Sequence, residues 1–258
     1  MKILSIGGDE RFRFAADKLS ESYTAGIWQE NSPPGEDERF GGFLLPINPW
    51  GRAEDIIAEY AGQNAVVFAG KPSERLRDFC RENGFSLYDY VNRPDFAEAN
   101  AVPTAEGTLE IIFRETGRIL AGREVLITGY GRLGKVLARY IAALGGKVTV
   151  AARKNIDGGT DFTAVKLPEF LTERPENVSR FDIVINTVPA LLFTKKHTHR
   201  FRRNALIIDL ASVSAFPALS RADLRFIHAL SLPGKTAPVT AGEIIADTVK
   251  AIMEENGL

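Results

Sequence analysis

Apolar and polar positions alternate in short blocks along the first ninety residues of the chain. Residues 2–6 form a short apolar run, and residues 9–20 have the apolar spacing of an amphipathic helix. Further strands are predicted at 26–29, 43–47, 65–69 and 85–90, and further helices at 53–61 and 73–83. Strands that alternate with helices in this way are typical of an α/β layer built on a parallel sheet.

The segment NRPDFAEANAVPTAEG breaks this rhythm and predicts a junction. Pro103 favours an extended backbone at Val102. Thr104 is a good N-cap residue, and Glu106 then falls in the first turn, where the helix dipole favours an acid. We therefore expect a helix at about 105–120 that connects the first unit to a second one.

The second unit repeats the alternation and ends in a long amphipathic segment. Strands are predicted at 123–128, 147–151, 182–186, 205–209 and 225–229, with a helix at 133–144. Residues 240–256 carry apolar side chains on one helical face. The predicted fold is a doubly wound parallel sheet of the Rossmann type at 102–237, with a smaller α/β substrate-side domain at 1–101. We expect the C-terminal helix, about 238–258, to pack back on the smaller domain.

A glycine loop, GYGRLG, lies between the first strand and helix of the second unit. Its spacing is that of a dinucleotide-binding turn. Gly129 permits the sharp turn, a side chain at Gly131 would obstruct a pyrophosphate, and one at Gly134 would push the helix off its strand. Arg132 and Leu133 fill the variable positions, and the helix N-terminus offers N–H donors to phosphates. A glycine-rich turn without a ligand is the alternative, but the strand before and the helix after favour a coenzyme site.

The end of the next strand predicts which coenzyme binds. NAD sites place a carboxylate there for the ribose hydroxyls, whereas this chain has Arg153 and Lys154 and no acid before Asp157. A guanidinium can hold a 2′-phosphate with two hydrogen bonds, and Lys154 and Arg132 add positive charge. The sequence therefore favours NADP over NAD, although the two cations would also suit a solvated strand end.

Residues after later strands are expected to complete the coenzyme crevice, because ligands of open parallel sheets bind outside the carboxyl ends of the strands. Asp209 is one of these predicted coenzyme residues, but it is equally suited to cap the loop beneath it. The remaining predicted coenzyme residues are Thr187, Val188, Pro189, Ala211, Ser212, Pro233 and Gly234.

Composition narrows the function classes. The 258 residues carry 32 lysines and arginines against 33 aspartates and glutamates, a formal net charge of −1. A near-neutral chain is a poor candidate for binding nucleic acid or an anionic membrane. The single cysteine, Cys80, excludes an internal disulfide, fits a cytoplasmic protein and is expected to be a small buried residue. The short apolar run after Met1 is too brief for a signal peptide or a membrane span.

Several segments, in order, resemble the dipicolinate synthase A subunit family, relatives of the 2-hydroxyacid and alanine dehydrogenases. The more specific ones are PTAEG at the junction and LPGKTAPVTAG near the end. The others are IGGDER, GYGRLGKVLARYIAALGGKVTVAAR, INTVPA and IIDLAS. Residues 32–50 and 154–180 match least.

This resemblance implies a sporulation enzyme. It implies two domains with a nucleotide crevice between them, and NADP-linked oxidation of a dihydrodipicolinate or hydroxy-tetrahydrodipicolinate precursor to pyridine-2,6-dicarboxylate. It also implies a partner, which is a separate and flavoprotein-like B subunit. A homo-oligomer is expected.

The dianionic substrate directs attention to cations and helix starts. Arg11 matches the GGD-x-R motif and is a candidate for binding one carboxylate; Lys235 is a candidate for the other or for catalysis. Glu106 is a candidate base, although it equally suits a helix start. Further candidates for substrate contacts are Asn100, Thr104 and Thr240.

The histidines give a weaker signal. His228, at a strand end, is a catalytic candidate but suits a packed or capping role better. His197 and His199 lie in KKHTHRFRR, which we interpret as a solvated loop, and neither cysteine nor carboxylate lies near them in sequence, so a metal site is disfavoured.

Two other functions remain open at this stage. One is a single-subunit NAD(P) dehydrogenase for a 2-hydroxy or 2-amino acid, which would need an arginine and a histidine–carboxylate pair. The other is a non-catalytic nucleotide-binding protein that regulates a partner, an alternative that the scarcity of an evident acid–base group keeps open.

Overall fold

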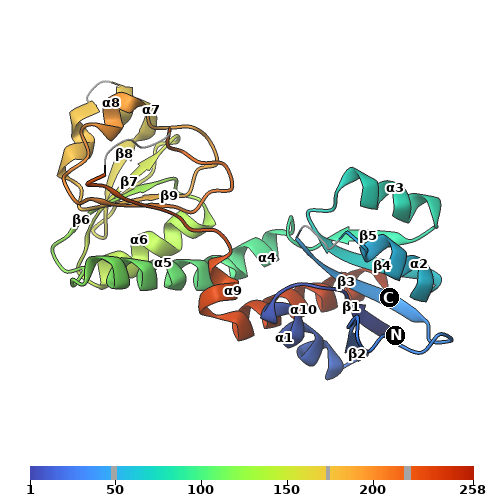
Figure 1. The fold of residues 1–258 in the computed structure, drawn as a ribbon. Coiled ribbons are helices and arrows are strands. Elements are labelled where there is room, and N and C mark those ends of the chain that lie inside the picture. The colour runs from blue at the N-terminus through green and yellow to red at the C-terminus, as the bar shows by residue number, and fades with distance from the viewer. Residues whose placement is uncertain (48–50, 173–174, 218–221) are drawn as a thin grey trace. The chain divides into compact units, whose positions relative to one another are not determined.

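The computed structural model describes residues 1–47, 51–172, 175–217 and 222–258, which divide into two compact units. Unit 1 comprises Met1–Pro103 and Pro233–Leu258, and unit 2 comprises Thr104–Leu232 (Figure 1). Each unit is an α/β layer with one parallel sheet and helices on both faces, which is the predicted fold class.

Unit 1 contains a five-stranded parallel sheet in the order β2-β1-β3-β4-β5. Alternate residues of its strands face two separate cores, because successive side chains point to opposite faces. Ile3 lies in the core shared with α1 and α10, and Leu4 lies in the core shared with α2 and α3. The strands are β1 (Lys2–Ser5), β2 (Thr24–Ile27), β3 (Phe40–Ile47), β4 (Ala61–Gly70) and β5 (Ser86–Asp89). The helices are α1 (Glu10–Ser20), α2 (Ala53–Tyr60), α3 (Glu74–Glu82), α4 (Pro94–Ala99), α9 (Leu232–Thr236), whose first residue belongs to unit 2, and α10 (Pro238–Asn256).

The C-terminal helix α10 packs on α1 at a point where glycine is required. A Cβ atom at Gly242 would lie 2.5 Å from the carbonyl oxygen of Arg11 and 2.9 Å from the amide nitrogen of Ala15. At the far end of α10, Glu255 pairs with Arg93, which precedes α4 (2.7 Å between Oε2 and Nη1). The C-terminal helix is thus an integral layer of unit 1.

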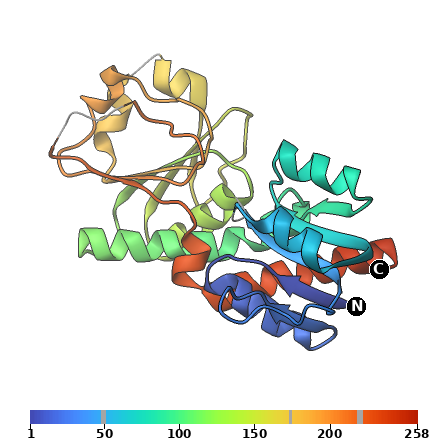
Figure 2. The same ribbon diagram turned by 45° about the vertical axis from the view of Figure 1, so that its right-hand side comes forward.

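Unit 2 contains a six-stranded parallel sheet in the order β11-β10-β9-β6-β7-β8. Helices α5 and α6 cover one face of the sheet (Figure 2), where Ile112, Leu137 and Ile141 are buried, and a cluster of phenylalanines is buried on the other face. The strands are β6 (Glu124–Thr128), β7 (Lys147–Ala152), β8 (Thr163–Lys166), β9 (Ile183–Asn186), β10 (Leu206–Asp209) and β11 (Arg225–His228). The helices are α5 (Ala101–Thr116), whose first three residues belong to unit 1, α6 (Arg132–Ala143), α7 (Leu167–Thr172), the 3-10 helix η1 (Pro175–Arg180) and α8 (Lys195–Thr198).

Several predicted boundaries need correction. Helix α5 begins at Ala101, not near 105, so Thr104 lies inside the helix and Glu106 lies beyond its first turn. Pro103 is compatible with this, because N–H groups of a first helical turn have no partner within the helix. Thr240 likewise lies inside the first turn of α10, which begins at Pro238. Strand β8 and the short helix α9 were not predicted.

Cys80 lies on the buried face of α3, as expected, and burial raises the pKa of its thiol to about 11. Among the described residues, each helix is too short or too polar to traverse a lipid bilayer.

Buried side chains join three strand ends of unit 2. Asn186, at the end of β9, accepts a hydrogen bond from the Thr128 hydroxyl (2.6 Å) and donates one to Asp209 (2.8 Å). Asp209 also accepts hydrogen bonds from Ser214 Oγ (2.8 Å) and the Ala215 amide (2.9 Å). All three strand-end residues are fully buried. Asp209 is therefore the structural anchor of the loop after β10, which was one of its two predicted roles.

We predict that Asp209→Ala lowers the free energy of unfolding by about 3–5 kcal/mol, because several buried donors lose their acceptor at once. Asp209→Asn keeps one acceptor oxygen and is expected to cost less. Urea unfolding followed by circular dichroism measures both, with the exposed Asp157→Ala as control. Equal stability of Asp209→Ala and the unmutated chain would contradict the anchoring role.

Candidate functional site

Two positions of the glycine loop between β6 and α6 are packed too closely against other atoms to carry a side chain. Gly129 has φ +97°, and a Cβ atom there would lie 2.3 Å from Thr187 Oγ1. A Cβ atom at Gly134 would lie 2.2 Å from the carbonyl oxygen of Gly129. These two glycines are thus required by the protein itself, because α6 could not otherwise start so close to β6.

Gly131 is different, because the protein leaves space around it. Its φ is −82°, and a Cβ atom there would meet no atom within 4 Å. It is the N-cap of α6, and no side chain caps this helix. The first turn carries Arg132 and Lys135 and no acid, an arrangement that a bound anion at the helix N-terminus would stabilise. The open cradle therefore fits the diphosphate of a dinucleotide.

Two exposed cations follow β7, next to the glycine loop in the sheet order. Arg153 and Lys154 come directly after Ala152, the last residue of β7. A small cavity of about 120 Å³ is lined by residues after β7 and on β8, including Lys154 and Lys166. Lys166 pairs with Glu169 (2.8 Å between Nζ and Oε1). Sequence reasoning missed Lys166, because the strand that carries it was not predicted; a TAVK alternation was its only signal.

The later strand ends provide small residues and structural polar groups. Thr187 donates its hydroxyl to the carbonyl of Thr128 (2.8 Å), so this side chain fixes the glycine loop. Val188 is half-buried and Pro189 is exposed. Ala211 is buried and Ser212 is exposed after β10. Together with the loop, these residues lie at the carboxyl edge of unit 2, where ligands of this fold bind.

His228 and Glu106 also belong to unit 2. His228 Nε2 lies 2.8 Å from the carbonyl oxygen of Ala211, so this nitrogen donates and ties β11 to the loop after β10. The interaction fits the packed or capping role. Glu106 is exposed on α5, and Thr104 is half-buried on the same helix.

His197 does not lie in a solvated loop, contrary to the expectation. It is buried, accepts a hydrogen bond from the Thr194 amide at Nδ1 (2.9 Å), and lies 2.9 Å through Nε2 from the carbonyl of Leu171. It forms a capping box for α8.

Arg11, a predicted substrate residue of unit 1, contacts Asp9 and Gly234. The Asp9 carboxylate caps α1 and accepts hydrogen bonds from Arg11 Nε (2.8 Å) and Nη2 (2.7 Å). These hydrogen bonds hold the pKa of Asp9 below its usual range. Gly234 lies against the same guanidinium, since a Cβ atom there would be 2.7 Å from Nε. Lys235, the next residue on α9, is exposed.

The other predicted residues of unit 1 have structural positions. Asn100 is the C-cap of α4 and half-buried, and Thr240 is exposed in the first turn of α10. Pro233 is buried beside Gly234 in α9.

Lys71 is a candidate that sequence reasoning missed. It follows β4 with φ +50°, a backbone conformation that costs energy for a residue with a side chain. Its amide donates to Asp89 Oδ1 (3.1 Å). The neighbouring Tyr90 is buried, donates to the Leu45 carbonyl (3.0 Å) and has a raised pKa because of burial. The carboxyl edge of the first sheet thus presents an exposed lysine on a strained backbone.

Comparisons with known proteins agree with the sequence motifs. No protein family model matches the chain. The dipicolinate synthase A subunit of Bacillus subtilis is 32% identical over 195 residues, which are 74% of this chain and 66% of that protein. The chain is a homologue of the dipicolinate synthase A subunit. The matched stretch spans just under two thirds of that relative's own length.

Solved structures extend this homology to nearly the whole fold. The crystal structure of the dipicolinate synthase A subunit from Bacillus halodurans has a TM-score of 0.82 at 26% identity, covering 98% of this chain and 97% of that one. An L-alanine dehydrogenase has a TM-score of 0.70 at 14% identity, covering 99% and 90%. The homology to the dipicolinate synthase A subunit therefore includes both units, each with the fold that dehydrogenases share.

We predict that two substitutions in the glycine loop have different effects, one on stability and the other on coenzyme binding. Gly134→Ala is expected to lower the free energy of unfolding by about 1–3 kcal/mol, because the new methyl group meets a backbone carbonyl. Gly131→Ala is expected to cost less than about 1 kcal/mol, since it meets open space, and to weaken NADPH binding at least about tenfold by blocking the cradle. Thermal unfolding and fluorescence titration measure the two effects. Unchanged NADPH affinity of Gly131→Ala would refute the cradle.

Proposed function

We propose that the chain is the NADP-dependent dehydrogenase subunit of dipicolinate synthase. It oxidises a cyclic dihydrodipicolinate or hydroxy-tetrahydrodipicolinate precursor to pyridine-2,6-dicarboxylate. The observation that carries the proposal is the open, uncapped N-terminus of α6 at Gly131, beside Arg153 and Lys154, in a homologue of the dipicolinate synthase A subunit. The proposal keeps the cytoplasmic location that the single cysteine favours and the sporulation role that the family resemblance implies.

The coenzyme half is assigned from the contacts of unit 2. The N–H groups at the start of α6 hold the diphosphate, with Arg132 adding charge, and Arg153 with Lys154 binds the 2′-phosphate. When bound, NADP⁺ supplies a hydride acceptor. Thr187 and His228 keep the neighbouring loops in place through their hydrogen bonds to backbone carbonyls.

The substrate half is assigned to the cations of unit 1. Arg11, oriented by Asp9, binds one carboxylate of the dianion, and Lys235 or Lys71 binds the other. Loss of a hydride to NADP⁺ and of a proton from dihydrodipicolinate gives an aromatic ring, so the base need not be strong, whereas the hydroxy-tetrahydro precursor must also lose a molecule of water. Glu106 is the first candidate for this base. Lys235 and His228 follow, and the bond from His228 Nε2 to Ala211 favours the tether role for this histidine.

A second protein completes the proposal. The Bacillus subtilis relative is by its name one subunit of a synthase, and a flavoprotein-like B subunit is the partner that the resemblance implies. We propose that full turnover requires this B subunit.

We predict that Arg153→Ala weakens NADPH binding about ten- to a hundredfold and NADH binding much less, since only NADPH carries the charged 2′-phosphate that accepts a charge-assisted hydrogen bond. Titration of both reduced coenzymes by fluorescence measures the difference. Arg139→Ala, an exposed arginine on α6, serves as the control. Equal losses for the two coenzymes would count against NADP.

The proposed reaction predicts NADPH formation, followed by absorbance, when NADP⁺ and the precursor are mixed with the chain and the B subunit. Arg11→Gln is expected to lower kcat/KM at least about tenfold while leaving NADPH affinity unchanged, because a charge-assisted carboxylate contact is lost. Arg13→Gln, exposed on the same helix, is the matched control. Absence of turnover in every combination would reject the proposal, and turnover of simple 2-keto acids by the isolated chain would favour a single-subunit dehydrogenase.

A further inference from the structure

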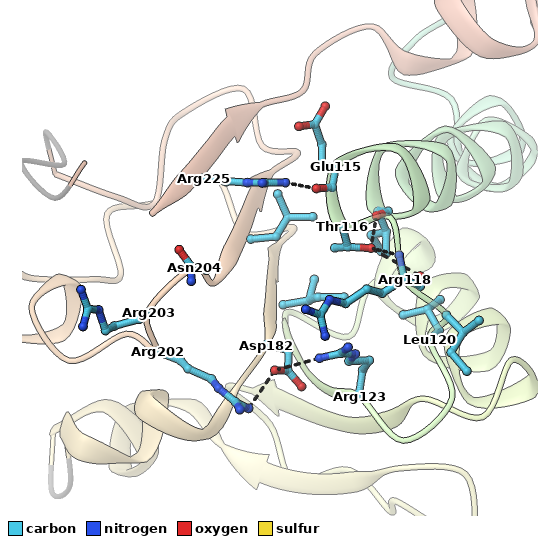
Figure 3. Close-up of a pocket in the computed structure, with 14 residues that line it drawn as sticks. Glu115, Thr116, Arg118, Leu120, Arg123, Asp182, Arg202, Arg203, Asn204 and Arg225 are labelled. Atoms are coloured by element: carbon cyan, nitrogen blue, oxygen red, sulfur yellow. Dashed lines mark hydrogen bonds and ion pairs between the residues drawn. The ribbon is translucent and has the colours of Figure 1, made fainter. Parts of the chain in front are cut away.

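A cavity of about 440 Å³ opens at the amino edge of the second sheet (Figure 3). It is lined by the end of α5, by the segment before β6, and by the starts of β9, β10 and β11. The glycine loop lies at the opposite, carboxyl edge of the same sheet. This cavity is therefore separate from the proposed coenzyme cradle.

Five arginines and two acids line the cavity. The arginines are Arg118, Arg123, Arg202, Arg203 and Arg225. The acids are Glu115 and Asp182. The difference is a formal charge of +3 in one cavity, on a chain whose net charge is −1. Arg118, Arg202 and Arg203 are exposed, so the partners of each arginine decide which guanidinium groups are available to a ligand.

Three of the five arginines have partners in the protein. Arg225 donates to the backbone carbonyl of Glu115, near the C-terminus of α5, where a cation is favoured by the helix dipole. Asp182 forms ion pairs with two arginines: its Oδ1 lies 2.8 Å from Arg202 Nη1 and 3.6 Å from Arg123 Nη1. One carboxylate thus serves two guanidinium groups.

The side chains of Arg118 and Arg203 have no hydrogen-bond or ion-pair partner within the described parts of the chain. Figure 3 shows Arg118 extended into the cavity toward Arg123 and Asp182, while Arg203 lies at the rim. A planar guanidinium with open donors suits a carboxylate or phosphate group, which it can hold with two parallel hydrogen bonds. Apolar side chains, among them Ile119 and Leu120, complete the lining.

We propose that this cavity binds a small anion with two or more phosphate or carboxylate groups, held by Arg118 together with Arg123 and Arg202. The size supports a small molecule, because ligand pockets span roughly 300–1,000 Å³. The shared chemistry is that of a multivalent oxyanion, and Asp182 competes with it for two of the three guanidinium groups. The site does not depend on the proposed dehydrogenase reaction.

Isothermal titration with pyrophosphate and, separately, with citrate tests the proposal and distinguishes phosphate from carboxylate ligands. We expect at least one to bind. Arg118→Gln is expected to weaken that binding about ten- to a hundredfold, since a charge-assisted contact is lost. Asp182→Asn is expected to strengthen it several-fold, because Arg123 and Arg202 are released. Arg118 has no acceptor among the described residues, so its replacement is expected to leave the thermal unfolding temperature unchanged.

Two further variants locate the binding. Arg114→Gln is the matched control, because Arg114 is exposed on α5 and pairs with Glu110 and Glu115. It is expected to leave the affinity unchanged. Gly131→Ala reports on the glycine loop, where pyrophosphate also fits, and is expected to leave the affinity of the cavity unchanged.

Several results would overturn the proposal. They are no binding of either anion, binding that Arg118→Gln leaves unchanged, and binding that Gly131→Ala abolishes while Arg118→Gln does not. Binding of an acidic octapeptide in the absence of binding by either small anion would assign the cavity to a protein partner and would also overturn it.

Discussion

The close approach of α6 to β6 is the constraint on which the rest of unit 2 depends. It requires no side chain at Gly134, where the nearest atom would be a backbone oxygen. It also requires Thr187, whose hydroxyl bonds to Thr128 and whose position leaves no room for a side chain at Gly129. The loop is therefore set by the protein's own packing, and it does not wait for a ligand to shape it. What remains open is Gly131, the only one of the three glycines that the described protein atoms do not explain.

The carboxyl edge of the second sheet is also stabilised by buried hydrogen bonds between the ends of its strands. Thr128, Asn186 and Asp209 stand at the ends of three adjacent strands and exchange donors and acceptors away from water. Such a network is stable only when it is fully satisfied, because an unpaired buried polar group is costly. The loops that would face a coenzyme are consequently fixed by residues that need not touch it. Asp209, which the sequence suggested equally as a ligand contact, is occupied by four donors from the protein.

Much of the fold could be predicted because its signals are local. Alternating blocks predict the strands, and the glycine spacing predicts the turn between β6 and α6. The start of α5 was misplaced because Pro103 reads as a helix boundary, although a first helical turn accepts proline. The buried His197 could not be recognised, because its partners, Thr194 and the Leu171 carbonyl, define its role only after folding. Lys71 was missed for the same reason, since a positive φ leaves no trace in a sequence.

The pair formed by Asp9 and Arg11 limits what one arginine can do for a dianionic substrate. Nε and Nη2 of Arg11 both donate to Asp9, whose pKa is lowered by these bonds and which therefore stays ionised at neutral pH. The ion pair is close to neutral as a unit, and Nη1 is the nitrogen that its carboxylate leaves available. Arg11 would then orient a carboxylate more than it would neutralise one. A substrate with two negative charges needs a further cation, and unit 1 offers Lys71, strained and exposed, and Lys235, directly after the glycine that contacts Arg11. At Lys71 the positive φ is accompanied by a hydrogen bond from its amide to Asp89 Oδ1 (3.1 Å), and the ammonium group is left exposed for that charge.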